Sequence, residues 1–173
     1  MRLVHYDKQP IAFDWNCVYP RKEMDTFKPS GLWVSDAHDY GWKDWCTAED
    51  FCTDSLEYEY LVELQPDHNI LIISTVEELD KFHEEYSVDI LKAYRGSATP
   101  FNLEPRKEWL DWNRIYPLYQ GIIITPYLWE RRMSGYMWYY GWDCAGGCIW
   151  DLSAIKTFQQ ILKQLIWKGG NNA

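Results

Sequence analysis

Short apolar stretches of strand length, each closed by a turn residue or a proline, constrain the fold of this chain most. Residues 57–64 (EYEYLVEL) alternate between glutamates and aromatic or aliphatic side chains, which is typical of an antiparallel strand with one face in water. Apolar runs at 69–73 (NILII) and 121–125 (GIIIT) predict buried strands. Shorter runs predict further strands at 2–6, 32–35 and 148–152.

Helical signals stand between these strands. Thr75 followed by Glu78 is a capping box, and an apolar stripe continues that helix to about Tyr86. Helical spacing of apolar and aromatic residues predicts three more helices, at 39–52, at 109–116 and at 153–167, the last stopped by Gly169. Because strands and helices do not alternate regularly, the pattern favours an α+β fold with a mainly antiparallel sheet.

Two stretches look irregular. Residues 7–30 contain three prolines and predict a long excursion, and residues 94–106, with glycine, serine and proline, predict a loop. Neither has the composition of a linker, and 173 residues fit a single domain spanning residues 1–173.

The net charge of the chain indicates which classes of binding partner to expect. The formal net charge is −9, whereas a protein that follows a nucleic-acid backbone needs a basic stripe. The closest basic clusters, Arg21–Lys22 and Arg131–Arg132, are too short for that role. We therefore expect no general nucleic-acid binding. No stretch approaches the roughly 20 apolar residues of a membrane span, so no membrane partner is expected either.

Aromatic residues and cysteines carry further information. Eleven tryptophans and thirteen tyrosines suit a core with polar seams or a pocket that stacks planar ligands. The five cysteines match neither a familiar disulfide framework nor a zinc-binding CxxC pair, and no secretion signal is apparent. We expect reduced thiols, no metal and a cytoplasmic location. A cysteine hydrolase is the weakest alternative, with Cys46 and His38 or with Cys144.

Three widely separated pieces of sequence define a candidate site. His5 lies in the first strand (LVHY), Trp33 and Ser35 lie in a later strand (LWVS), and Asp143 precedes a late strand. This ordered set resembles the ADP-ribosyltransferases with a His–aromatic–acid signature, which include diphtheria-toxin-type enzymes and a phage anti-CRISPR transferase. The chain departs from that family where a Glu usually opens the last strand, since residues 145–147 are Ala-Gly-Gly.

The resemblance implies a fold, a substrate and a role for each residue. The family fold has two small antiparallel sheets that form a cleft, with flanking helices. NAD would be the substrate, held by His5, Trp33 and Ser35. Asp143, ahead of Asp151, would be the catalytic carboxylate that opposes the oxocarbenium charge developing as nicotinamide leaves. ADP-ribose would pass to a macromolecular acceptor, a protein in the simplest case, or to water.

Each of these residues also has a plain structural reading. His5 could be a half-buried strand residue, Ser35 or Asp36 could cap the next helix, and Asp143 could end a turn. A second class of function therefore stays open, a non-catalytic interaction or inhibitor protein with an aromatic-rich binding surface.

Overall fold

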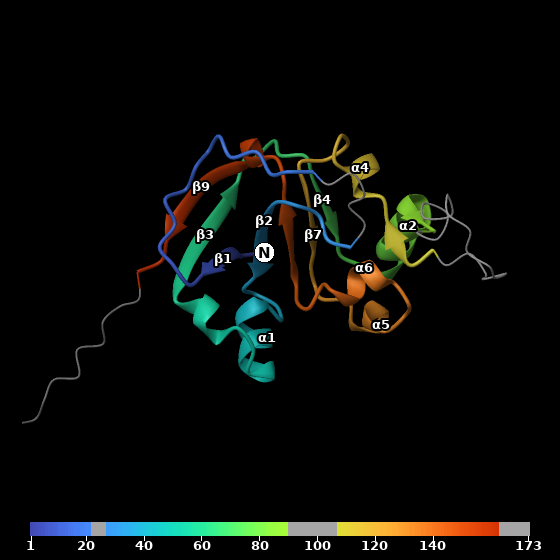
Figure 1. The fold of residues 1–173 in the computed structure, drawn as a ribbon, viewed down its shortest axis with the longest axis horizontal. Coiled ribbons are helices and arrows are strands. Elements are labelled where there is room, and N and C mark those ends of the chain that lie inside the picture. The colour runs from blue at the N-terminus through green and yellow to red at the C-terminus, as the bar shows by residue number, and fades with distance from the viewer. Residues whose placement is uncertain (22–26, 90–106, 163–173) are drawn as a thin grey trace, which may run out of the picture.

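The strands form one large sheet. The computed structural model describes residues 1–21, 27–89 and 107–162, and its seven-stranded sheet has the order β4-β7-β8-β2-β1-β3-β9 and curls along that order (Figure 1). The strands are β1 (Leu3–Asp7), β2 (Leu32–Asp36), β3 (Tyr58–Leu64), β4 (Ile70–Ile73), β7 (Gly121–Ile124), β8 (Gly146–Ile149) and β9 (Ile155–Gln160). A separate two-stranded ladder joins β5 (Ser87–Val88) to β6 (Trp109–Leu110).

The expected α+β fold, with two small antiparallel sheets forming a cleft and flanking helices, is therefore wrong: the described residues are mainly β-structure, with few helices. β8 pairs antiparallel with β2 on one side and with β7 on the other, and so joins all the long strands into one sheet. That sheet is mixed, because β4 and β7 are parallel. The join needs close backbone approach: a Cβ on Gly147 would collide with the Ile122 carbonyl, and one on Gly146 with the Val34 carbonyl.

The last strand replaces a predicted helix. In place of a helix at 153–167, a 3₁₀ turn, η2 (Leu152–Ala154), leads into β9, which pairs antiparallel with β3. The free edge of β3 offers backbone donors and acceptors that need partners. Ile155 and Phe158 pack on the sheet, and these contacts outweigh the helical spacing of their segment. Residues 163–167 and Gly169 lie outside the described residues.

The predicted helix at 109–116 begins instead as strand β6, and only Trp112–Ile115 is helical, whereas several other elements lie close to their predicted places. In β3, Tyr60 and Val62 are buried and Glu63 is exposed, which confirms the predicted alternation. The Thr75 hydroxyl accepts from the Glu78 N–H, and the Glu78 carboxylate accepts from the Thr75 N–H, so α2 (Val76–Tyr86) begins with the predicted capping box. The predicted loop at 94–106 lies outside the described residues. The other helices are α1 (Trp42–Glu49), α4 (Trp112–Ile115), α5 (Trp129–Arg132) and α6 (Met137–Tyr140), with a 3₁₀ turn η1 (Thr53–Leu56).

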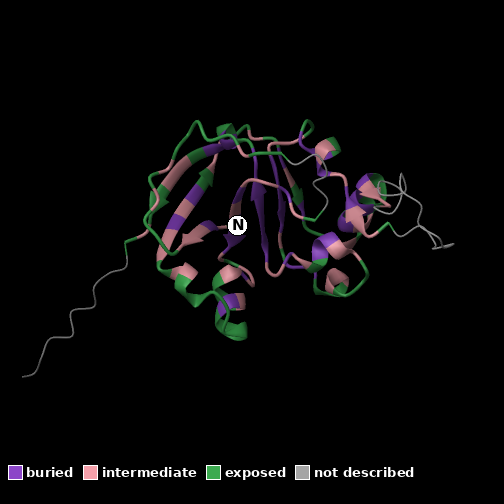
Figure 2. Cartoon of the chain, in the orientation of Figure 1, coloured by how far each residue is buried: buried purple, intermediate pink, exposed green. Residues whose placement is uncertain are grey.

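The sheet buries a different apolar cluster on each face, and its central strands are buried most deeply (Figure 2). One face, here the helical face, packs against α2, α4 and α6 around the fully buried Trp112, Trp138 and Trp142. The rings of Trp112 and Trp138 meet edge-to-face, with centroids 6.0 Å apart. The opposite face buries mainly aliphatic residues, among them Val62 and Ile123. Many of the aromatic residues are thus core. No helix in the described ranges is long and apolar enough to cross a membrane.

A polar cluster fastens α2 to the segment containing α5 and α6. The Arg131 guanidinium donates to both oxygens of Asp80, at 2.7 and 2.6 Å, and the Tyr136 hydroxyl donates to the same carboxylate at 3.0 Å. The Tyr136 ring stacks on His83 with centroids 3.7 Å apart. His83 Nδ1 accepts a 3.1 Å hydrogen bond from the Trp138 indole, so that nitrogen carries no proton.

This arrangement predicts a loss of stability in mild acid. Burial lowers the pKa of His83 and, likewise, the pKa of His5. The folded chain thus binds these protons less readily than the unfolded chain, so stability is highest above the unfolded pKa of about 6.5 and declines as the pH falls through it. We expect the free energy of unfolding in urea to decrease from about pH 7.5 to about pH 5.

The variant His83→Gln separates His83 from other acid-labile groups, because glutamine can still accept from the Trp138 indole and does not titrate. The free energy of unfolding of this variant should decrease less than that of the wild-type protein over the same pH interval. Equal pH dependence in the two proteins would contradict a role for His83.

Candidate functional site

The predicted residues of β1 and β2 border one cavity. It has a volume of about 350 Å³ and lies between these strands, the segment before β2, and the chain from α1 to η1. This volume is near the lower end of the roughly 300–1,000 Å³ found for small-molecule sites. The lining includes the candidate residues His5, Trp33 and Ser35, together with Val4, Tyr6, Lys28, Val34, Trp42, Cys52, Ser55 and Cys144.

Ser35 lines this cavity and has a buried hydroxyl. The residue is only 4% exposed, and its Oγ has no hydrogen-bond partner among the described residues. A buried polar group left unpaired costs about 1–3 kcal/mol, and the large majority of such groups are paired. Ser35 does not cap the next helix, since α1 begins at Trp42. Among the residues that line the cavity, Ser35 therefore has a buried hydroxyl with unused hydrogen-bonding capacity.

Asp36, the next residue, organises the turn after β2. Its carboxylate accepts from the backbone N–H groups of Arg2 and His38, at 2.8 and 3.0 Å, and from the Thr125 hydroxyl at 2.9 Å. Burial alone would raise the pKa of Asp36, but these hydrogen bonds outweigh it and lower that pKa. Asp36 thus ties β2 to β1 and β7 beside the cavity.

Aromatic rings and one cation complete the cavity wall. The Trp33 ring packs edge-on against Trp142 of the core, with centroids 4.7 Å apart, and the Lys28 ammonium lies 5.0 Å from the Trp33 ring centroid. The Trp42 indole donates to the Ser55 hydroxyl at 3.2 Å, which fixes its ring. Lys28 forms no ion pair with a described carboxylate. The cavity therefore offers flat apolar surface and one positive charge.

The His5 side chain points away from these groups. Val4 pairs with Ser35 and shares its face of the sheet, so strand alternation directs His5 to the opposite face. There the His5 ring lies 5.9 Å from the Phe158 ring. His5 Nδ1 donates to the Trp33 carbonyl oxygen at 2.7 Å. His5 borders the cavity but holds the backbone of β2, and its ring does not lie beside the indole of Trp33.

Asp143 lies in an adjoining recess. This recess, about 50 Å³ in volume, shares five lining residues with the cavity: Lys28, Trp33, Val34, Trp42 and Cys144. The Asp143 carboxylate accepts from Arg132 at 3.3 Å, and the same guanidinium donates to the Tyr127 hydroxyl. The fold thus brings Asp143 into the neighbourhood of Trp33, although the two residues are 110 positions apart in the chain.

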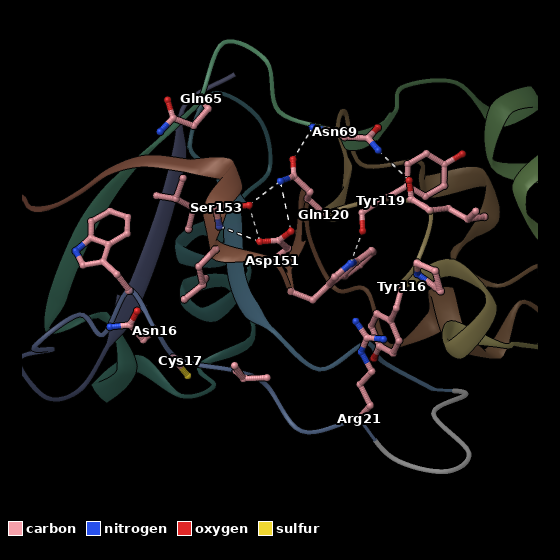
Figure 3. A pocket seen from close by; sticks show the side chains of 17 residues that line it. Asn16, Cys17, Arg21, Gln65, Asn69, Tyr116, Tyr119, Gln120, Asp151 and Ser153 are labelled. Carbon is pink, nitrogen blue, oxygen red and sulfur yellow. Dashed lines mark hydrogen bonds between the residues drawn. The ribbon is translucent and has the colours of Figure 1, made fainter.

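Asp151, the alternative acid, lies elsewhere. Its carboxylate accepts from the Ser153 N–H at 3.0 Å and from the Ser153 hydroxyl at 2.6 Å, and so caps η2. It lines a second, larger cavity of about 720 Å³ (Figure 3). Of the two candidate acids, only Asp143 borders the region of Trp33 and Ser35.

The cysteine chemistry considered as an alternative finds little support. Burial raises the pKa of Cys46 to about 11 and the pKa of Cys144 to about 12, so neither is a thiolate near neutral pH. No disulfide joins any of the five cysteines. The described ranges contain no cluster of three or more His, Cys, Asp or Glu side chains able to hold a metal ion.

Comparison with known proteins adds no identity, since no protein-family model, curated protein or solved structure matches this chain. The resemblance to ADP-ribosyltransferases therefore rests on the sequence alone: on His5, on Leu32–Ser35, loosely on the strand at 121–125, and on Asp143–Asp151. Sequence reasoning missed Lys28 as a site residue. It lies in an irregular segment whose path over Trp33 has no signature in the sequence.

Thiol reactivity checks this geometry. Cys17 and Cys52 are exposed, whereas Cys46 and Cys148 are buried and Cys144 has a raised pKa. We expect two thiols to react rapidly with Ellman's reagent in the folded protein, one after Cys17→Ser, and all five in denaturant. Rapid reaction of three or more thiols in the folded protein would contradict the arrangement. Because Cys52 borders the cavity, its rate also reports on occupancy.

Proposed function

We propose that this chain binds NAD in the cavity bordered by Trp33 and Ser35 and cleaves the bond between nicotinamide and ribose. ADP-ribose passes to a macromolecular acceptor, a protein in the simplest case, or to water. The observation that carries the proposal is the unpartnered, buried hydroxyl of Ser35 at an aromatic cavity with one cation. The proposed reaction is the one that the resemblance to ADP-ribosyltransferases implies, although the chain does not have the two-sheet fold expected from that family.

Each part of the nicotinamide half of NAD finds a suitable group. The indoles of Trp33 and Trp42 offer flat surfaces for the nicotinamide ring. The Ser35 hydroxyl can both donate to and accept from a ribose hydroxyl. Lys28 supplies positive charge for the pyrophosphate. With a volume of about 350 Å³, the cavity suits the nicotinamide riboside portion, and the adenosine would extend beyond it.

Asp143 supplies the electrostatic part of the proposed reaction. The C–N bond breaks, its electron pair leaves with nicotinamide, and positive charge develops on the ribose before an acceptor oxygen bonds to C1 and loses its proton. A fixed carboxylate near that ribose lowers the energy of the charged transition state. The Arg132 guanidinium at 3.3 Å holds the Asp143 carboxylate in position at the recess.

His5 has a different role in this proposal from the one that the resemblance implies. Its ring lies against Phe158, and its Nδ1 is bonded to the Trp33 carbonyl. We therefore assign it to positioning: it holds the backbone of β2 so that Trp33 and Ser35 face the cavity.

The melting temperature of the protein with and without NAD tests the proposed binding. NAD should raise the melting temperature, by an amount that corresponds to about 2.7 kcal/mol at a hundredfold excess over Kd. Ser35→Ala should remove most of that shift, yet leave the free protein as stable as before or more so, because it deletes an unpaired buried hydroxyl. Trp33→Ala should also reduce the shift.

Ser153→Ala is the matched control, because it removes a hydroxyl from the second cavity. It should keep the full shift with NAD. No shift of the wild-type protein at millimolar NAD would refute the proposal and favour the interaction-protein alternative.

Asp143→Asn tests the chemical step. This variant keeps the shape of the side chain and removes its charge, so it should fold and bind NAD but release nicotinamide about 10²–10³-fold more slowly. Asp151→Asn is the comparison and should retain activity, since Asp151 lies at the other cavity. Full activity in both variants would remove the carboxylate from the mechanism, and loss only in Asp151→Asn would transfer the role.

A non-catalytic interaction protein is the second candidate, and a particular surface favours it. Trp129, Met133 and Tyr140, on and beside α5 and α6, are 53%, 80% and 47% exposed. Exposed aromatic and methionine side chains are enriched where proteins bind each other. This function predicts that substitutions on that surface abolish activity in the cell while NAD has no effect.

A further inference from the structure

We propose that the larger cavity is a second ligand site, which binds a small molecule that carries a flat ring and an oxyanion, either a carboxylate or a phosphate. Its volume is about 720 Å³, and it shares no lining residue with the cavity at Ser35 or with the recess at Asp143. It lies between the N-terminal segment 15–21 and the loops at one end of the sheet, around residues 65–69, 116–120 and 150–155.

Arg21 is the group that selects an oxyanion. Its guanidinium carbon lies 4.8 Å from the centroid of the Tyr116 ring (Figure 3). That ring is held in place, because the Tyr116 hydroxyl accepts from the Ser30 N–H at 2.9 Å and the residue is buried. A stacked guanidinium keeps its in-plane N–H donors, which match the two oxygens of a carboxylate or phosphate. Arg21 forms no ion pair with a described carboxylate.

Trp15 supplies a surface for a flat ring at the same cavity. Half of this residue is exposed, yet it is held by its neighbours. Its indole packs edge-on against Phe13, with centroids 4.8 Å apart, and Phe13 stacks on Phe158 of β9 at 4.1 Å. An indole that is fixed on one side and open on the other can stack a planar ligand at little cost in side-chain entropy.

Hydrogen bonds between lining residues already fix one part of the cavity wall. The Gln120 amide donates to the Ser153 hydroxyl at 2.8 Å and accepts from the Asn69 N–H at 2.6 Å, and Ser153 donates to Asp151 (Figure 3). These groups satisfy one another and give the cavity a fixed shape. The negative charge of Asp151 disfavours an anion beside it, so the oxyanion would lie at the Arg21 end.

The charge of the whole chain sets the expected strength. A net charge of −9 opposes anion binding, and Arg21 must offset it locally. A single anion with one ring should therefore bind with a Kd in the millimolar range, weakening as ionic strength rises.

The test uses benzoate and phenyl phosphate as probes and benzamide as the neutral counterpart. Binding is followed in ¹H–¹⁵N spectra through the indole N–H signal of Trp15, assigned with Trp15→Phe. We expect saturable shifts with at least one anion, and binding of benzamide about tenfold weaker or more. The anion that binds more tightly identifies the carboxylate or the phosphate as the preferred group.

Variants locate the site. Arg21→Gln should weaken anion binding about tenfold, and Arg21→Lys should have an intermediate effect because it keeps the charge without the planar fork. Lys28 does not line the larger cavity, so Lys28→Gln should leave the anion titration of the Trp15 signal unchanged. The absence of a saturable shift with both anions would overturn the proposal. So would unchanged binding in Arg21→Gln, or loss of binding in Lys28→Gln, which would place the anion in the other cavity. These outcomes are independent of whether NAD binds.

Discussion

The position of β8 between β2 and β7 is the constraint on which the rest of the structure depends. All four residues of β8 are buried, and Gly146 and Gly147 let the neighbouring backbones approach where any side chain would collide. The register pairs Ser35 with Gly146, so the residue opposite the Ser35 hydroxyl has no side chain to cover it. The same short strand thus joins the two parts of the sheet and leaves room for the cavity.

Both cavities place a cation against an aromatic ring in an acidic protein. Lys28 lies over Trp33 in one, and Arg21 lies over Tyr116 in the other. A ring face attracts a cation without neutralising it, whereas a carboxylate would cancel its charge. Local positive charge for an anionic group is therefore compatible with a net charge of −9. The aromatic residues serve two purposes here, since Trp33 also packs on Trp142 of the core.

The candidate site also shows that residues of one sequence motif can lie on different faces of the sheet. His5, Trp33 and Ser35 lie in the expected strands and border one cavity, yet the His5 ring lies on the other face of the sheet. Asp143 reaches the same region through the loop before β8, with Arg132 as its partner. The proposed chemistry depends on the residues that share the helical face, and His5 contributes by holding β2.

The sequence by itself determined the local elements. Alternation defined β3, apolar runs defined β4 and β7, and Thr75 with Glu78 defined the start of α2, because each signal lies within a few neighbouring residues. Only the tertiary structure decided that Ile155–Gln160 is a strand, that β8 merges the strands into one sheet, and that Lys28 lies over Trp33. Those outcomes depend on which backbone edge is free and which side chain faces it, and such contacts join residues far apart in the chain, where no local period records them.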